Sequence, residues 1–213
     1  MSTFPRRAKP LRGGFVMVDP DTGRPQKTIP FQYNPDTLTR TLQPQGIGNE
    51  PGDRLEVLRL KGPPHETYKF DAEFDASDLA DGADLPADGL YPVLSAIEVS
   101  MYPSVPQLWE EYDLATKGTL EIAPVESPLT VLVLGPRRVL PVRITDFSVT
   151  EEEFDQALAP VRAKASIGVR VLTVDDLGYT HKGGLLYLAY QGQKERMAAP
   201  VDSGLGTLGV SSI

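Results

Sequence analysis

The residues that most often carry enzyme chemistry do not combine into catalytic or metal-binding patterns in this sequence. There are two histidines, His65 and His181, and no cysteine. Neither histidine belongs to an HExxH motif or to a pair at metal-ligand spacing, and no G-x-S-x-G sequence offers a serine nucleophile. Residues 46–48 (GIG) lack the third glycine of a dinucleotide-binding fingerprint, and residues 182–184 (KGG) lack the rest of a phosphate-binding loop. We therefore predict no catalytic residue, no cofactor and no metal ligand, and we expect the protein not to be an enzyme.

Four carboxylates cluster in one segment of the chain, at Asp71, Glu73, Asp75 and Asp78. Oxygen ligands at alternate positions bind Ca²⁺ in EF-hand loops, but such a loop needs glycine at its sixth position, where this chain has Ala76. The first three carboxylates also alternate with apolar residues, which is typical of the solvent-facing side of a strand, and we interpret them in that way. Nothing in the sequence singles out a glycosidase-type pair among the 29 acidic residues.

Composition and charge narrow the class of protein further. The 213 residues are 40% hydrophobic and 23% charged, as expected for one globular domain, and the 19 glycines and 20 prolines favour turn-rich β structure over a helical bundle. A net charge of −8 disfavours nucleic acid and anionic membranes as partners. The basic N-terminal segment is not followed by an apolar region of signal-peptide length, and no apolar run is long enough to span a membrane. The absence of cysteine fits a reducing cytoplasm, where we expect the protein to reside.

Alternating hydrophobicity predicts most of the strands of the domain, including the one that carries the carboxylates at 71–75. The clearest run is 66–76, in which Tyr68, Phe70, Ala72 and Phe74 share one face. A second run, 160–172, alternates in the same way, and the apolar phase of 139–149 changes face near Asp146, which predicts a bulge. Further strands are expected in a hairpin over 13–33, at 55–60 and at 129–134.

Helical periodicity is confined to few segments. Leu90, Leu94, Ile97 and Met101 recur at spacings of three and four, which predicts a helix over 89–101. One or two further helical turns are expected over 107–116, ended by Gly118. The sequence NPDTL at 34–38 reads as an N-cap followed by a single helical turn, whereas 151–159 reads as an acidic loop and 185–190 as a strand or a short helix.

The chain as a whole divides into three predicted parts. Residues 1–12 read as a flexible basic arm, 13–190 as a single β-domain and 191–213 as a polar, Gly/Ser-rich C-terminal tail that is disordered alone. The predicted fold class is mainly β with one packed α-helix, in the form of a β-sandwich or barrel.

Several segments, in the same order and spacing over about residues 13–175, resemble the tube-domain family of contractile injection systems. Residues 29–38 (IPFQYNPDTL) are similar to that family's opening F-x-[FY]-N-P-x-x-L signature, and residues 68–76 (YKFDAEFDA) are similar to its alternating strand ending in Phe-Asp. Residues 128–135 (PLTVLVLG) resemble its apolar strand ending in glycine. The stretch 144–171 resembles its strand, loop and second strand, which here opens PVRAKAS at residue 160.

The resemblance implies a tube-protein-like fold that assembles into a ring, expected to be a hexamer, which joins the spike or hub of the baseplate to the inner tube and initiates tube assembly. Its implied partners are copies of itself, the inner tube protein, the spike or hub protein and other baseplate subunits, within an injection particle that can be released from the cell. Larger members carry a C-terminal LysM module, which this chain lacks room for after residue 190, and LPVR at 140–143 replaces the expected glycine-containing turn.

A principal tube protein and an adaptor ring stay open as alternatives within that interpretation. A small-molecule or carbohydrate-binding β-domain protein, acting as a hydrolase accessory, is the alternative from a different class. We also expect the arm 1–12, the loop 43–64 and the tail to contact neighbouring subunits.

Overall fold

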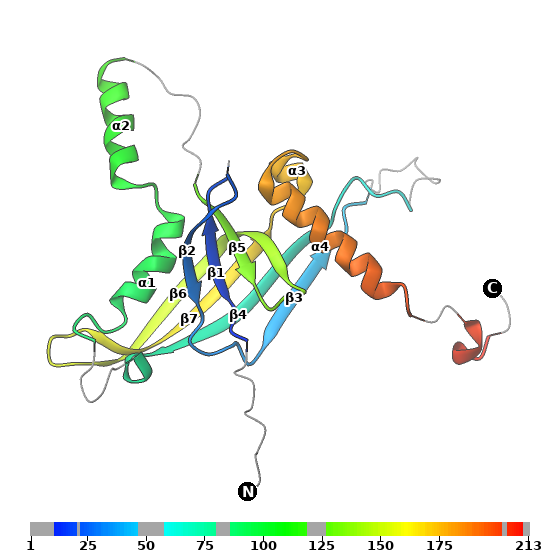
Figure 1. Cartoon of the computed structure of the whole chain (residues 1–213), viewed down its shortest axis with the longest axis horizontal. Helices are drawn as coiled ribbons and strands as arrows, with labels where there is room; N and C mark the ends of the chain where they lie inside the picture. The colour runs from blue at the N-terminus through cyan, green and yellow to red at the C-terminus, as the bar shows by residue number, and fades with distance from the viewer. Residues whose placement is uncertain are drawn as a thin grey trace, which may run out of the picture.

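The protein is mainly β, as predicted, and its strands form one seven-stranded antiparallel sheet in the order β2-β1-β5-β6-β7-β4-β3 (Figure 1). The computed structural model describes residues 11–20, 22–46, 58–79, 86–118, 127–201 and 204–210. The strands are β1 (Gly14–Val18), β2 (Pro25–Pro30), β3 (Leu38–Gln43), β4 (His65–Asp75), β5 (Leu129–Val133), β6 (Val139–Phe154) and β7 (Pro160–Val171). Within these described ranges, four α-helices and three short 3-10 helices accompany them, namely η1 (Ala76–Leu79), α1 (Tyr91–Glu98), η2 (Val99–Met101), α2 (Val105–Thr116), α3 (Val174–Leu177), α4 (Lys182–Ala198) and η3 (Leu205–Leu208).

The neighbouring strands β4 and β7 confirm the alternation seen in the sequence. The apolar residues of β4 are buried, and its Lys69, Asp71 and Glu73 are exposed. Strand β7 pairs with β4 in antiparallel register, so that Ala72 lies opposite Ala165 on the buried face. Because side chains alternate across a strand, each of the two strands has one apolar and one polar face.

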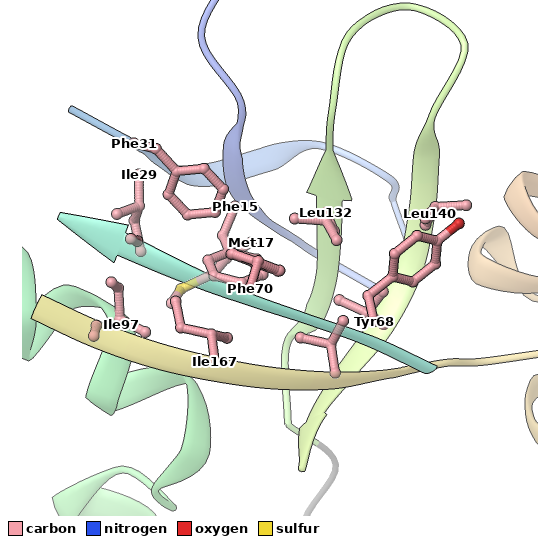
Figure 2. Packing of buried hydrophobic residues seen from close by; sticks show 14 of the residues in the cluster. Phe15, Met17, Ile29, Phe31, Tyr68, Phe70, Ile97, Leu132, Leu140 and Ile167 are labelled. Carbon is pink, nitrogen blue, oxygen red and sulfur yellow. The ribbon is translucent and has the colours of Figure 1, made fainter. Parts of the chain in front are cut away.

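The sheet folds over on itself around a single aromatic cluster, which gives it a sandwich-like form (Figure 2). The ring of Phe15, on β1, lies 6.4 Å from that of Phe70, on β4, although three strands separate β1 from β4 in the sheet. Phe31, directly after β2, lies between them, with ring centroids 5.3 Å and 5.4 Å away. Each such aromatic contact stabilises the fold by about 0.5–1.5 kcal/mol beyond the stabilisation that comes from burying the rings.

The predicted change of face near Asp146 is a β-bulge. The register of β6 against β7 shifts between Ile144 and Asp146, and Gly168 lies opposite the bulge. A Cβ atom on Gly168 would lie 3.0 Å from the Cβ of Asp146, so the glycine leaves room for the bulged strand. Strand β6 then continues to Phe154, which places 151–154 in the strand rather than in the predicted acidic loop.

Helix α1 is the predicted packed helix. Leu90, Leu94 and Ile97 are buried against the sheet, and the helix continues as η2 to Met101. The second predicted helix is also present as α2, and Gly118 follows it with a φ of +76°. Positive φ is a conformation that glycine adopts without steric cost.

Helix α4 is one of the two alternatives predicted for 185–190, a helix rather than a strand, but it is much longer than expected. It runs from Lys182 to Ala198, so it crosses residue 191, where the predicted polar tail begins. Tyr187 and Tyr190 are buried against the sheet, and this packing holds a helix whose sequence has little amphipathic pattern of its own. Gly184 permits its first turn to approach the chain closely, because a Cβ there would lie 2.0 Å from the carbonyl oxygen of Gly178.

The predicted helical turn at 34–38 is wrong. The backbone bends at 32–33 and 36 and then enters β3, which the sequence reasoning did not identify. The side chain of Asn34 does not cap a helix. Its Oδ1 accepts a hydrogen bond from the Gly13 amide at 2.8 Å, and its Nδ2 donates one to the Leu11 carbonyl at 2.8 Å. Asparagine side chains offer the backbone such alternatives to helix formation.

Several sequence predictions lie outside the described residues in whole or in part. These are most of the arm 1–12, the centre of the loop 43–64 with residues 55–57 of its predicted strand, and residues 202–203 and 211–213 of the predicted tail. At the base of that loop, Leu60 forms a β-bridge with Gly46, and the Lys61 amide donates to the Gln45 carbonyl at 2.8 Å.

Candidate functional site

The outer face of the sheet carries a field of charged side chains on β4 and β7. On β4, Lys69, Asp71 and Glu73 are exposed, and on β7, Arg162 and Lys164. The ammonium of Lys164 lies 3.5 Å from the carboxylate of Asp71 and 3.8 Å from that of Glu73. The field continues onto β6 through small polar residues, because Thr150 lies opposite Lys164 in register. Exposed pairs of this kind contribute only about 0–1 kcal/mol each, so they define a hydrated surface more than they stabilise the fold.

The four carboxylates singled out in the sequence are drawn into separate contacts. Asp71 and Glu73 share Lys164, whereas Asp75 accepts hydrogen bonds from Arg162 Nη2 at 3.1 Å and from the Ser77 amide at 2.8 Å. The Ser77 hydrogen bonds and then the Arg162 guanidinium lower the pKa of Asp75.

Asp78, the fourth carboxylate of the segment, accepts a hydrogen bond from the hydroxyl of Tyr33, and that bond raises the pKa of the tyrosine. Across the part of the chain that the structure describes, no three His, Cys, Asp or Glu residues gather where they could hold a metal ion.

The two histidines occupy different structural positions. His65 is exposed at the first residue of β4, opposite Gln43 of β3. His181 is the N-cap of α4, where its Nδ1 accepts a hydrogen bond from the Gly183 amide at 3.1 Å. An N-cap acceptor satisfies one of the unpaired amides at the start of a helix, so His181 has a structural role.

A buried polar cluster that the sequence reasoning missed lies between β4 and α4. Glu66 is 2% exposed, and its Oε1 accepts hydrogen bonds from the hydroxyls of Tyr68 at 2.7 Å and Tyr190 at 2.8 Å. Its Oε2 accepts one from Lys194 Nζ at 2.8 Å, and Arg40 Nε on β3 lies 3.8 Å from Oε1. The signal was present in the sequence, since Glu66 stands in phase with the apolar face of β4 and is the one charged residue in that position.

The electrostatics of the cluster favour the ionised form of the glutamate. Burial alone would raise the pKa of Glu66, but hydrogen bonds from Lys194, Tyr68 and Tyr190 outweigh it and leave that pKa below its ordinary value. Burial and the neighbouring carboxylate raise the pKa of Tyr190 well above its ordinary range. The ammonium of Lys194 also lies 4.1 Å from the centre of the Tyr190 ring, a cation–π contact. Because the carboxylate is fully engaged by donors, we interpret the cluster as a clamp that holds α4 on the sheet.

The tip of the β6–β7 hairpin is exposed and acidic. Residues 151–154 (EEEF) are all exposed, and the turn is closed by Asp155, whose carboxylate accepts hydrogen bonds from the amides of Ala157 and Ala159 at 2.8 Å. Leu158 is exposed on this turn with a φ of +62°, which is rare for a residue other than glycine. Residues held in such sparsely populated backbone conformations cluster at functional sites, so the hairpin tip is a candidate functional surface.

A cleft of about 660 Å³ opens between η2 and the ends of β5, β6 and β7. Its lining mixes apolar residues such as Leu129 and Ile144 with charged ones, including Arg143, Arg170 and Glu111. Arg170 is engaged there by the carboxylate of Asp176.

No protein-family model matches the chain, and the search of curated proteins gave no match. None of the helices that the structure describes is both long and apolar enough to cross a membrane.

Proposed function

We propose that this chain is a structural subunit of a contractile injection system that forms a ring, joins the spike or hub of the baseplate to the inner tube and initiates tube assembly. The proposal starts from the ordered sequence segments that resemble the tube-domain family. The observation that carries it is the long two-faced sheet formed by β4, β6 and β7, which is apolar inside and carries charged and small polar side chains outside. Repeated around a ring, such a face suits a water-filled lumen.

Three side chains of the segment that carries the strongest resemblance have a structural role. Phe31 is fully buried in the aromatic cluster. Gln32 closes a two-way link to β4, since its Nε2 donates to the Asp75 carbonyl at 2.7 Å and its Oε1 accepts from the Asp75 amide at 2.8 Å. Asn34 links to Leu11 and Gly13 in the same way. A motif of this type fixes the corner between β2 and β3, which supports its use as a fold signature.

The edges of the sheet also support self-association. Strand β2 is protected as an edge by Pro25, Lys27 and Pro30, whereas β3 carries Arg40 but no proline or lysine over Leu38–Gln43 and is exposed along nearly its whole length, so it is the less protected edge. Natural sheets usually block a free edge with such residues. An edge without them suits a protein whose working state is an assembly.

The test is the assembly state of the purified chain. Light scattering coupled to size exclusion and negative-stain microscopy are expected to show a closed ring, with six-fold symmetry in class averages. Rings mixed with the inner tube protein are expected to shorten the lag of tube growth. A chain that stays monomeric at every concentration, or rings that leave the lag unchanged, would contradict the proposal.

A second candidate, a small-molecule or carbohydrate-binding β-domain, is supported by the cleft beside η2, whose volume of about 660 Å³ falls in the usual range for ligand sites. This candidate predicts a stable monomer whose melting temperature rises with a glycan or another small ligand. Substitution of Arg143 in the cleft is then expected to abolish that rise.

A further inference from the structure

Helix α2 presents an apolar stripe to solvent. Val105, Leu108, Trp109 and Tyr112 recur at the i, i+3, i+4, i+7 spacing of one helical face, and all four are exposed. The rings of Trp109 and Tyr112 contact each other edge to face at 6.0 Å, so the stripe forms one surface. The α2 stripe, as we call these four residues, belongs to a helix with no buried residue.

A helix of this kind needs a partner to be stable. Figure 1 shows α2 standing away from the sheet, joined to it through η2. Its capping box between Ser104 and Gln107 fixes where it starts, but helices of fewer than about 12–15 residues are marginal in water without packing. At helical spacing the carboxylates of Glu111 and Asp113 flank the stripe, one on each side, and the helix contains no lysine or arginine between Val105 and Thr116.

A surface of opposite charge lies at the base of the β3–β4 connection, at the other end of the molecule from α2 in the view of Figure 1. Leu42, Leu58 and Leu60 are exposed there, Leu58 to 95%. Three basic side chains, Arg40, Arg59 and Lys61, are exposed among them. We call these six residues the basic leucine patch. Its segments are tied together by the bridge between Gly46 and Leu60.

We propose that the α2 stripe of one copy of this chain docks on the basic leucine patch of the next copy. Apolar groups meet apolar groups, and the acidic rim of the helix meets the basic rim of the patch, which is the complementarity that selects a partner and its orientation. Two different complementary surfaces on opposite sides of one chain make a head-to-tail contact, and such contacts close into rings when the rotation permits. This inference rests on the proposed ring and names the contact within it.

The fluorescence of Trp109, which lies in the α2 stripe, can test this contact. Trp109 is the single tryptophan of the sequence and is 64% exposed in the isolated chain. Its emission and its quenching by acrylamide are measured while the purified protein is diluted through ring dissociation, which light scattering follows in parallel. Docking predicts a shift of emission to shorter wavelength and weaker quenching in the ring. Rings in which Trp109 stays as quenchable as in the dissociated chain would overturn the inference and leave the proposed function standing.

Matched variants separate the contact from general effects of substitution. Leu108→Asp in the stripe and Leu58→Asp in the patch are each expected to weaken assembly on the order of 100-fold, as loss of a central apolar contact does. Leu185→Asp in α4 is the control, because Leu185 and Leu108 are both 48% exposed leucines on helices. Circular dichroism checks that each variant is folded. Equal assembly of all three variants would refute the contact.

Charge reversal provides an independent readout. Asp113→Lys in the stripe rim and Lys61→Glu in the patch are each expected to weaken assembly, and the chain with both substitutions is expected to recover it. If the two substitutions only perturbed folding independently, their destabilising effects would add, and the double variant would assemble no better than either single variant. A double variant weaker than both single variants would contradict the docking. So would a blue shift of Trp109 that appears only with a different protein.

Discussion

Replacing Glu66 by glutamine tests whether the buried cluster clamps α4 to the sheet. The amide keeps one acceptor for Tyr68 and Tyr190, but its NH₂ group stands where the carboxylate accepted from Lys194 at 2.8 Å. Loss of a hydrogen bond between charged groups costs about 1.5–3 kcal/mol, and leaving one charge of a buried pair alone costs about 3–5 kcal/mol. Because Lys194 is 26% exposed and can turn towards water, we expect the lower part of that range, about 3 kcal/mol in the free energy of unfolding.

The expected loss is large enough to measure directly. For a chain of this length, 3 kcal/mol corresponds to a fall in melting temperature of about 6–12 °C. Urea unfolding followed by circular dichroism gives the free energy, and hydrogen exchange is expected to show faster exchange concentrated in α4. Glu73→Gln is the matched control, because Glu73 lies on the same strand with its side chain on the solvent face. A Glu66→Gln variant within about 0.5 kcal/mol of the parent, the usual scatter of surface substitutions, would refute the clamp.

The pH dependence of the same difference has a definite sign. The folded pKa of Glu66 lies below its unfolded value of about 4.3, so the unfolded chain binds more protons in that interval. The stabilisation is therefore fully present above about pH 4.3 and is lost as the pH falls through the folded pKa. The gap in stability between the parent and Glu66→Gln is expected to narrow as the pH is lowered from 5 to 3. A gap that widens there would show that the glutamate is protonated in the fold.

Three further substitutions test other parts of the structure by urea unfolding. Asn34→Ala removes two backbone-directed hydrogen bonds and is expected to cost about 1–2 kcal/mol, whereas Asp36→Ala nearby is expected to be near neutral. Gly184→Ala places a Cβ 2.0 Å from a carbonyl oxygen and is expected to cost more than about 3 kcal/mol, against a near-neutral Gly206→Ala, where nothing lies within 4 Å. Leu158→Gly relieves a φ of +62° and is expected to stabilise by about 0.5–1 kcal/mol; a destabilised variant would show that the leucine is packed within the chain.

The sequence predicted the parts of the fold whose pattern is local. Strands β4 and β7 alternate over eleven and twelve residues, and both were predicted with nearly their observed bounds. The bulge at Asp146 was predicted because the apolar phase of β6 shifts there. The helix at 89–101 was predicted from four apolar residues at helical spacing. Three of them, Leu90, Leu94 and Ile97, are buried in the structure, and Met101 is partly exposed.

The parts that sequence reasoning missed are held by contacts distant along the chain. Strand β3 has no clean alternation, because its residues lie at an edge and are exposed on both faces. Helix α4 contains three glycines and no clear apolar stripe, and two buried tyrosines hold it on the sheet. Lys194, the partner of Glu66 in α4, lies 128 residues later in the chain. No local sequence pattern could therefore reveal that the buried carboxylate of Glu66 pairs with a cation.

The Glu66 cluster and the proposed docking surface share strand β3, which links the stability of one to the geometry of the other. Leu42 of the basic leucine patch lies directly opposite Glu66 in the register of β3 and β4. Arg40, also in the patch, lies 3.8 Å from the buried carboxylate of Glu66, which Tyr68, Tyr190 and Lys194 also contact. An edge strand paired on one side only is among the first elements to fray. The clamp that binds α4 therefore also restrains the strand that presents the patch, and a rigid patch lowers the entropic cost of docking α2 from a neighbouring copy.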